Sequence, residues 1–129
     1  MKQRKNGAII DTFGMKLNAM VLLLRVKKYY SDNSVSAENL EQDIEDLLGE
    51  LQCFLSHPNI TTYDKAGFYS VRKLHFENVN KEEFCCCAKM SAELFRENGR
   101  IHRALEEAKL SGDTELLQQL SKEAQDIPE

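Results

Sequence analysis

The segment from Ser36 to His57 carries the clearest alternation of apolar and polar positions in the chain. Its apolar residues recur mostly at steps of three and four, at Leu40, Ile44, Leu47, Leu48, Leu51, Phe54 and Leu55. The positions between them are largely acidic, and no Lys or Arg occurs between Ser31 and Ile60. This spacing predicts an amphipathic helix, which Ser34 or Ser36 caps and Pro58 ends.

A second long helix is predicted from about Ile9 to Tyr30, after a mobile basic leader over residues 1–8. One helical stripe holds Ile10, Phe13, Leu17, Met20, Val21 and Leu24. Leu22, Leu23 and Val26 extend the apolar surface around much of the circumference. A helix that is apolar on most faces is typically central in its bundle or contacts a partner.

Residues 59–80 fit two readings. Asp64 can cap a short helix, whereas the alternation from Phe68 to Phe76 also fits a strand. A lone strand has no mate elsewhere in the chain, and an isolated pair is marginal in water, so a helix is favoured.

Three further helices are predicted, over residues 81–97, 100–110 and 114–124. Asn80 is placed to cap the first, which Asn98-Gly99 ends in a left-handed cap. Asp113, in a Ser-Gly-Asp turn, is placed to cap the last. Residues 125–129 are expected to fray.

These elements predict an all-α protein, a bundle of four or five helices with antiparallel neighbours joined by short loops. The two long helices would form its central hairpin. At 129 residues and 42% hydrophobic composition, one domain over residues 9–124 is expected. The only prolines, Pro58 and Pro128, leave the helix interiors intact.

The formal net charge of −4 is distributed unevenly along the chain. Residues 1–30 hold seven basic residues and one acid, whereas residues 31–60 hold seven acids and no Lys or Arg. The two stretches therefore attract one another, which favours a basic first helix lying against an acidic second one. The alternative is a nucleic-acid-binding module that uses the basic N-terminal segment.

Four cysteines are present, and three of them are consecutive: Cys53, Cys85, Cys86 and Cys87. Adjacent cysteines rarely reach bridging geometry, so reduced thiols and a cytoplasmic location are expected. The apolar run from Ala19 to Leu24 is far too short to span a bilayer, and no export signal follows Met1.

A zinc site built from these cysteines is the first candidate chemistry. Cys53 and His57 lie four residues apart and so share a helix face. The spacing matches no standard zinc motif, and three adjacent helical cysteines point in different directions. The favoured reading is that Cys87 is a small core residue, with Cys85 or Cys86 partly exposed, and that no metal or cofactor is bound.

Arg96 and His102, separated by five residues, are the second candidate. This pair resembles the motif of the HEPN ribonuclease family, small helical bundles that are usually dimeric and often act in toxin or phage-defence systems. The resemblance implies that Arg96 stabilises phosphate charge and that His102 acts as acid or base. It covers these two residues and the helical class, and Asn98-Gly99 places a helix end inside the motif.

The function we favour is that of a small non-catalytic interaction or regulatory module. It would act through helix–helix contacts with another protein or with itself, and not through a membrane. The residues assigned to that contact lie on the first helix: Leu17, Val21, Leu22, Leu24, Tyr29 and Tyr30. The ribonuclease and nucleic-acid readings are the alternatives.

Overall fold

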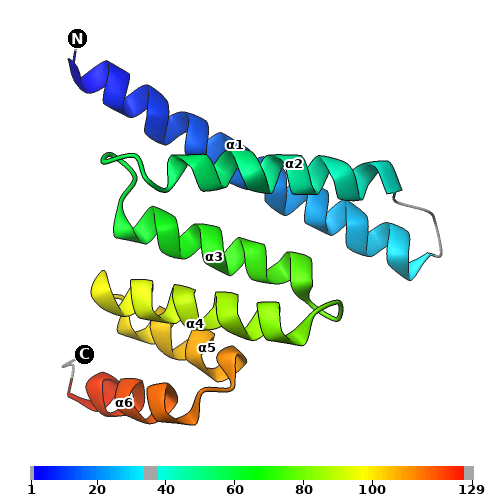
Figure 1. Ribbon diagram of the computed structural model, residues 1–129. Coiled ribbons are helices and arrows are strands. Elements are labelled where there is room, and N and C mark those ends of the chain that lie inside the picture. Colours follow the sequence, from blue (N-terminus) through cyan, green and yellow to red (C-terminus); the bar gives the residue numbers. More distant parts are fainter. Residues whose placement is uncertain (1, 34–37, 127–129) are drawn as a thin grey trace. The chain divides into compact units, whose positions relative to one another are not determined.

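The computed structural model describes residues 2–33 and 38–126, which form six α-helices (Figure 1). They are α1 (Lys2–Asp32), α2 (Glu38–Phe54), α3 (Thr62–Phe76), α4 (Lys81–Glu97), α5 (Ile101–Ser111) and α6 (Thr114–Gln125). No strand occurs in these residues. The all-α class is therefore confirmed, but the described chain has six helices where four or five were expected.

The count differs because residues 59–80 hold a complete helix with its own start signal. Thr61 is the N-cap of α3 and accepts a hydrogen bond from the backbone of Asp64, whose carboxylate accepts one from the Thr61 backbone in return. This reciprocal capping box satisfies two backbone donors at once. It favours a helix over the strand that the alternation from Phe68 to Phe76 also fitted.

The bounds of the two long helices also differ from the expected ones. Helix α1 begins at Lys2 rather than near Ile9, so residues 2–8, expected as a mobile leader, continue the helix. Lys, Gln and Arg are good helix formers, and no proline interrupts them. Helix α2 ends at Phe54 rather than His57. The expected caps Ser34 and Ser36 lie outside the described residues.

The chain divides into two compact units, Met1–Ile60 and Thr61–Glu129, and each is described by itself. One domain over residues 9–124 stays a prediction. In the first unit, α1 and α2 pack as an antiparallel hairpin (Figure 1). The buried apolar residues of its two helices are Phe13, Met20, Leu24, Ile44, Leu48 and Leu51. The rings of Phe13 and Phe54 stack with their centroids 5.9 Å apart.

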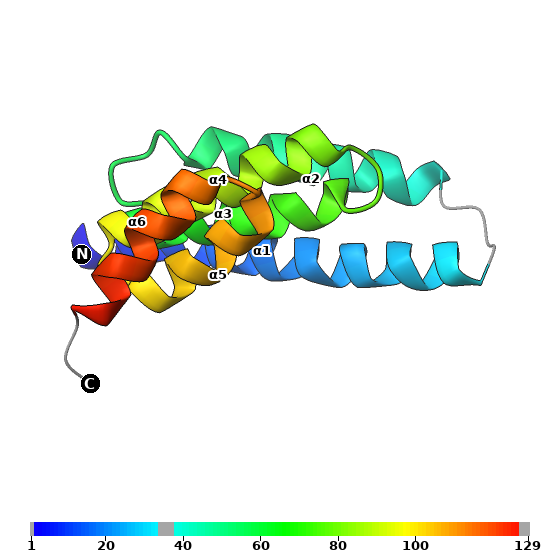
Figure 2. The ribbon, with the colours of Figure 1, turned by 90° about the horizontal axis from the view of Figure 1, so that it is seen from below.

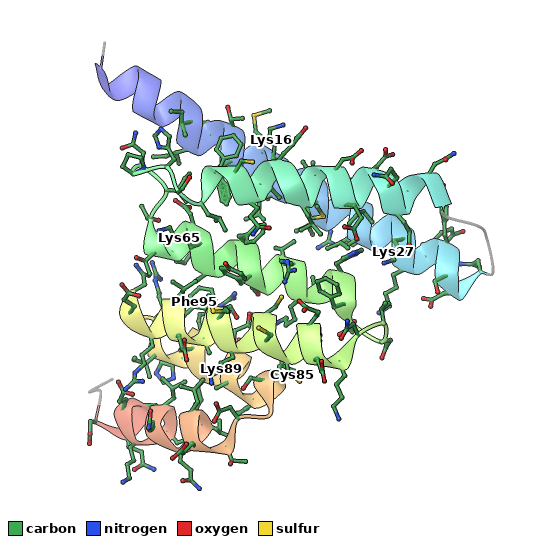
Figure 3. All side chains as sticks on the ribbon, viewed as in Figure 1. Lys16, Lys27, Lys65, Cys85, Lys89 and Phe95 are labelled. Carbon is green, nitrogen blue, oxygen red and sulfur yellow. The ribbon has the colours of Figure 1, made fainter. Side chains whose placement is uncertain are left out.

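Two ion pairs join the helices of this hairpin. Lys16 Nζ lies 2.8 Å from Glu50 Oε2, and Lys27 Nζ lies 3.2 Å from Glu41 Oε1 (Figure 3). The expected pairing of a basic first helix with an acidic second one is thus confirmed. Exposed pairs of this kind contribute about 0–1 kcal/mol each, so their main effect is on which helices pair.

In the second unit, α3 to α6 run in alternating directions, and each packs against the next (Figures 1 and 2). The predicted caps are confirmed: Asn80 accepts from the Glu83 backbone, and Asp113 accepts from the Leu116 backbone. Gly99 and Gly112 adopt the left-handed conformation that ends a helix, with φ of 83° and 76°.

One apolar cluster links all four helices of this unit. Its buried members are Ala66, Ala92, Phe95, Ala104, Ala108, Leu116 and Leu120. Phe95 is the largest of them: the Tyr63 ring meets it edge-on with centroids 6.0 Å apart, and the Arg103 guanidinium lies 4.9 Å from its centroid. The alanines let the helix backbones approach closely around this ring.

A buried ion pair connects α3 to α5. Lys73 Nζ donates to Glu107 Oε2, and both side chains are almost fully buried. Oε1 of Glu107 has no hydrogen-bond partner among the described residues. Such a pair contributes little net stability but is costly to break, because the remaining charge is then buried without a partner.

Within the described residues, no helix combines the length and the apolar character that a membrane crossing requires.

Truncation of the central ring should destabilise the second unit strongly. Phe95→Ala is expected to lower the free energy of unfolding by about 3–5 kcal/mol, because it removes buried surface and leaves a cavity. Val79→Ala, at a side chain 71% exposed in the same unit, should change it by less than about 0.5 kcal/mol. Urea unfolding of both variants tests this, and equal effects would contradict the position of Phe95 in the core.

Removing one partner of the buried Lys73–Glu107 pair should lower the unfolding free energy more than replacing both partners does. Lys73→Met leaves the Glu107 carboxylate buried without its counter-charge, and we expect a loss of about 3–5 kcal/mol. The double variant Lys73→Met/Glu107→Leu should recover most of this loss. A double variant no more stable than the single one, measured by urea unfolding, would show that the pair itself stabilises the fold.

Candidate functional site

An exposed apolar stripe runs along α1. Met15, Leu22, Val26 and Tyr29 are 72%, 59%, 39% and 63% exposed. Ala19 is also exposed. We call Met15, Ala19, Leu22, Val26 and Tyr29 the outer stripe. Large apolar side chains grouped in this way on a surface typically mark a contact with another molecule.

The outer stripe lies opposite the face of α1 that is buried. Residues of an α-helix advance by roughly 100° each, which places the mean direction of the stripe roughly 160° from that of Phe13, Met20 and Leu24. Among residues 9–32 of α1, these three are the buried apolar residues. Because α2 packs against α1 in this unit, the helix presents apolar residues on two opposite sides and buries one of them.

The spacing within the outer stripe is that of a coiled-coil seam. Its members follow one another at steps of four, three, four and three. This is the a/d pattern of a heptad repeat, in which two helices supercoil and their side chains interlock. From Met15 to Tyr29 the stripe extends about 21 Å along the helix axis. The stripe is therefore suited in shape to a second helix rather than to a small ligand.

The edges of the stripe differ from one another. Asp11, Asn18 and Arg25 follow one edge at steps of seven, and all three are exposed. Leu23 and Tyr30, both partly buried, lie on the other edge. In a coiled coil such flanking positions decide which partner and which orientation a helix accepts.

The structure separates the six contact residues predicted from the sequence. Leu22 and Tyr29 belong to the outer stripe. Leu17, Val21 and Tyr30 are partly buried. Leu24 is buried at 7% exposure and belongs to the buried face.

Met15, Ala19 and Val26 complete the stripe but were not among the predicted contact residues. Their four-and-three spacing is visible in the sequence. The sequence alone did not separate this stripe, because Phe13, Met20 and Leu24 form a second apolar stripe on the same helix. Together the two stripes make α1 look apolar on all sides.

Arg96 and His102 lie on different helices. Arg96 is in the last turn of α4, and its guanidinium makes a two-point contact with Glu123 of α6, at 3.2 Å and 2.9 Å. His102 is an exposed residue in the first turn of α5, beyond the turn at Gly99. The Arg96 charge is thus already matched by a carboxylate within the unit.

The cysteines do not group into a reactive site. Cys53 and Cys86 are exposed, Cys85 is partly buried and Cys87 is buried, as expected. Among the described residues, no three His, Cys, Asp or Glu side chains are close enough to hold a metal ion. His57 Nδ1 instead accepts a hydrogen bond from the Asn59 backbone, at 3.1 Å.

Cys87 has one charged neighbour. Arg72 Nη1 lies 2.8 Å from its Sγ and also 3.4 Å from Glu83 Oε2. Burial raises the pKa of the Cys87 thiol above its ordinary value, and the Arg72 charge offsets only part of that rise. The thiol is therefore protonated at neutral pH and is a poor nucleophile.

A shallow hollow of about 560 Å³ lies where the loop between α3 and α4 meets the end of α5. Val79, Phe84 and Leu110 supply its apolar wall, and its polar groups come from Glu77, Asn78, Lys81 and Cys85. None of the buried polar atoms that lack a partner in the described chain belongs to it.

Comparison with protein-family models, with curated proteins and with solved structures finds no significant match for this chain.

The raised pKa of Cys87 should make stability depend on this thiol at alkaline pH. The unfolded chain loses the proton near pH 9.0, whereas the folded chain holds it to higher pH. The contribution of the protonated Cys87 thiol to the unfolding free energy is thus complete below pH 9.0 and is lost as pH rises towards the pKa of the folded chain. We expect the unfolding free energy to fall less steeply above pH 9.0 in Cys87→Ala than in the wild type. Cys86→Ala, at an exposed position, is the control that should keep the wild-type slope.

Proposed function

We propose that this protein is an interaction module that binds a partner helix along the outer stripe of α1. The observation that carries the proposal is the exposure of Met15, Leu22 and Tyr29 at heptad spacing on the side of α1 opposite its buried face. Catalysis is not part of the proposed function.

Burial of the stripe supplies the driving force for binding. Covering a side chain of the size of Leu22 or Met15 is worth about 1.5–3 kcal/mol. One partner helix is long enough to cover several such residues together. Their binding free energies then add up to more than scattered exposed residues could contribute. An apolar helix face laid against another helix is a common mode of protein recognition.

Charge supports a protein partner over nucleic acid. Two lysines of the basic first helix, Lys16 and Lys27, are held by Glu50 and Glu41 of α2. Their charge is thus partly matched inside the hairpin. Arg25 and Lys28 are exposed, but the outer stripe itself is apolar rather than basic. Nucleic-acid binding normally relies on cations that remain free to meet phosphates.

Affinity capture from the native cells tests the proposal with three forms of the tagged protein. The wild type should retain a protein partner after nuclease treatment. Leu22→Glu should lose it, because the new carboxylate would be buried in the contact. Val79→Glu places the same charge at a still more exposed apolar site in the second unit and should retain the partner.

If Leu22→Glu binds the partner as well as the wild type does, the proposal that the outer stripe forms the contact is contradicted. Recovery of RNA in place of a protein would favour the nucleic-acid reading instead. Circular dichroism of each variant shows whether its helices are intact.

A further inference from the structure

We propose that the helix bound by the outer stripe is α1 of a second copy of this chain, lying parallel and in register. This inference rests on the proposed function and adds the identity of the partner.

The heptad positions of the stripe suit a two-stranded pairing. With Met15, Leu22 and Tyr29 at d, Ala19 and Val26 fall at a, and exposed Thr12 extends the a series. In a parallel pair each of these residues meets its own counterpart. A β-branched residue at a combined with Leu at d favours two strands over three or four, and Val26 with Leu22 follows that rule.

Two of the three flanking pairs are complementary in the parallel orientation, and the third brings Asn18 beside Leu23. In this heptad, position g holds Asp11, Asn18 and Arg25, and position e holds Lys16, Leu23 and Tyr30. In a parallel pair each g residue faces the e residue five positions later on the other helix. Asp11 of one copy then faces Lys16 of the other, which also holds Glu50 of its own hairpin. Arg25 faces Tyr30, a cation beside an aromatic ring. Both contacts occur twice in a symmetric dimer.

The antiparallel orientation brings like charges together. In that arrangement g residues face g residues of the other helix. Aligning the two stripes places Asp11 beside Asp32 of the second copy, or Arg25 beside Arg25 of the second copy, depending on the register. Like charges at these positions destabilise a pair, so the edge residues select the parallel form.

Sedimentation velocity of the full chain tests the pairing. The wild type and Val79→Glu should both sediment as dimers at high micromolar concentration. Leu22→Glu and Met15→Glu should each weaken dimerisation at least about tenfold, because either change puts two carboxylates into the seam. Both positions are exposed within the single chain, so the helices themselves should form, as circular dichroism checks.

A disulfide tests the orientation. In the parallel dimer, Met15→Cys places two thiols opposite each other at a d layer, within reach of a bond. In the antiparallel arrangements with aligned stripes, the two introduced cysteines would lie about 16 Å or more apart along the helix axis. Oxidation followed by peptide mapping should therefore find the two introduced thiols joined to each other.

The outcomes separate this inference from the proposed function. A monomeric wild type, or a dimer that Leu22→Glu leaves unchanged, overturns the pairing of α1 with itself. A stripe-dependent dimer without the Met15→Cys bond overturns the parallel orientation. If the wild type is monomeric but a different protein is captured and then lost in Leu22→Glu, the proposed function stands and its partner is another chain.

Discussion

Helix α1 has two apolar faces, and the single helix α2 packed against it within its unit can bury only one of them. Phe13, Met20 and Leu24 form the buried face, whereas Met15, Leu22 and Tyr29 remain exposed. One antiparallel neighbour covers a limited arc of a helix, roughly the width of an a/d seam. The first unit is thus a hairpin whose remaining apolar face can be covered only by something outside the hairpin. That exposed face is the reason to propose an interaction function for the first unit.

The second unit buries one apolar cluster between its own helices, although Leu74, Val79 and Leu110 remain exposed. Four helices contribute to one cluster, and the alanines around Phe95 let them approach closely. Several of the unit's charged side chains are held by structural contacts. Glu123 holds Arg96, Glu107 holds Lys73, and Arg72 lies between Glu83 and the buried Cys87. Each of these contacts spans at least eleven residues and ties neighbouring segments of the unit together, so their most direct consequence is a fixed packing of its helices.

Signals within a few residues were readable from the sequence, and signals between distant residues were not. The caps at Asn80 and Asp113 and the turn glycines Gly99 and Gly112 depend on one turn of chain, and they were predicted correctly. The helicity of residues 62–76 was favoured over a strand only by the lack of a mate, although Thr61 and Asp64 carry a local capping box that points to the same answer. The pairing of Arg96 with Glu123 joins residues 27 apart, and no local pattern announces it. Three of the five residues of the outer stripe were missed for a related reason. Two superimposed periodic patterns on α1 look like one broad apolar surface until the packing of α2 shows which of them is buried.

The charges on α1 serve two contacts. Lys16 and Lys27 pair with Glu50 and Glu41 of α2 on the side of the buried face, and Lys16 is also the residue that Asp11 of a second copy would face in the proposed pair. Asp11 and Arg25 lie on the opposite half of the helix, too far around its circumference to take part in the pairing with α2. Exposed charges add little to stability, and their placement beside an apolar row instead decides which second helix is accepted. An acid at one end of this edge and a base fourteen residues later distinguish parallel from antiparallel self-pairing. If the proposed pairing holds, the sequence of α1 specifies its contact with α2 on one face and its contact with a second copy on the other.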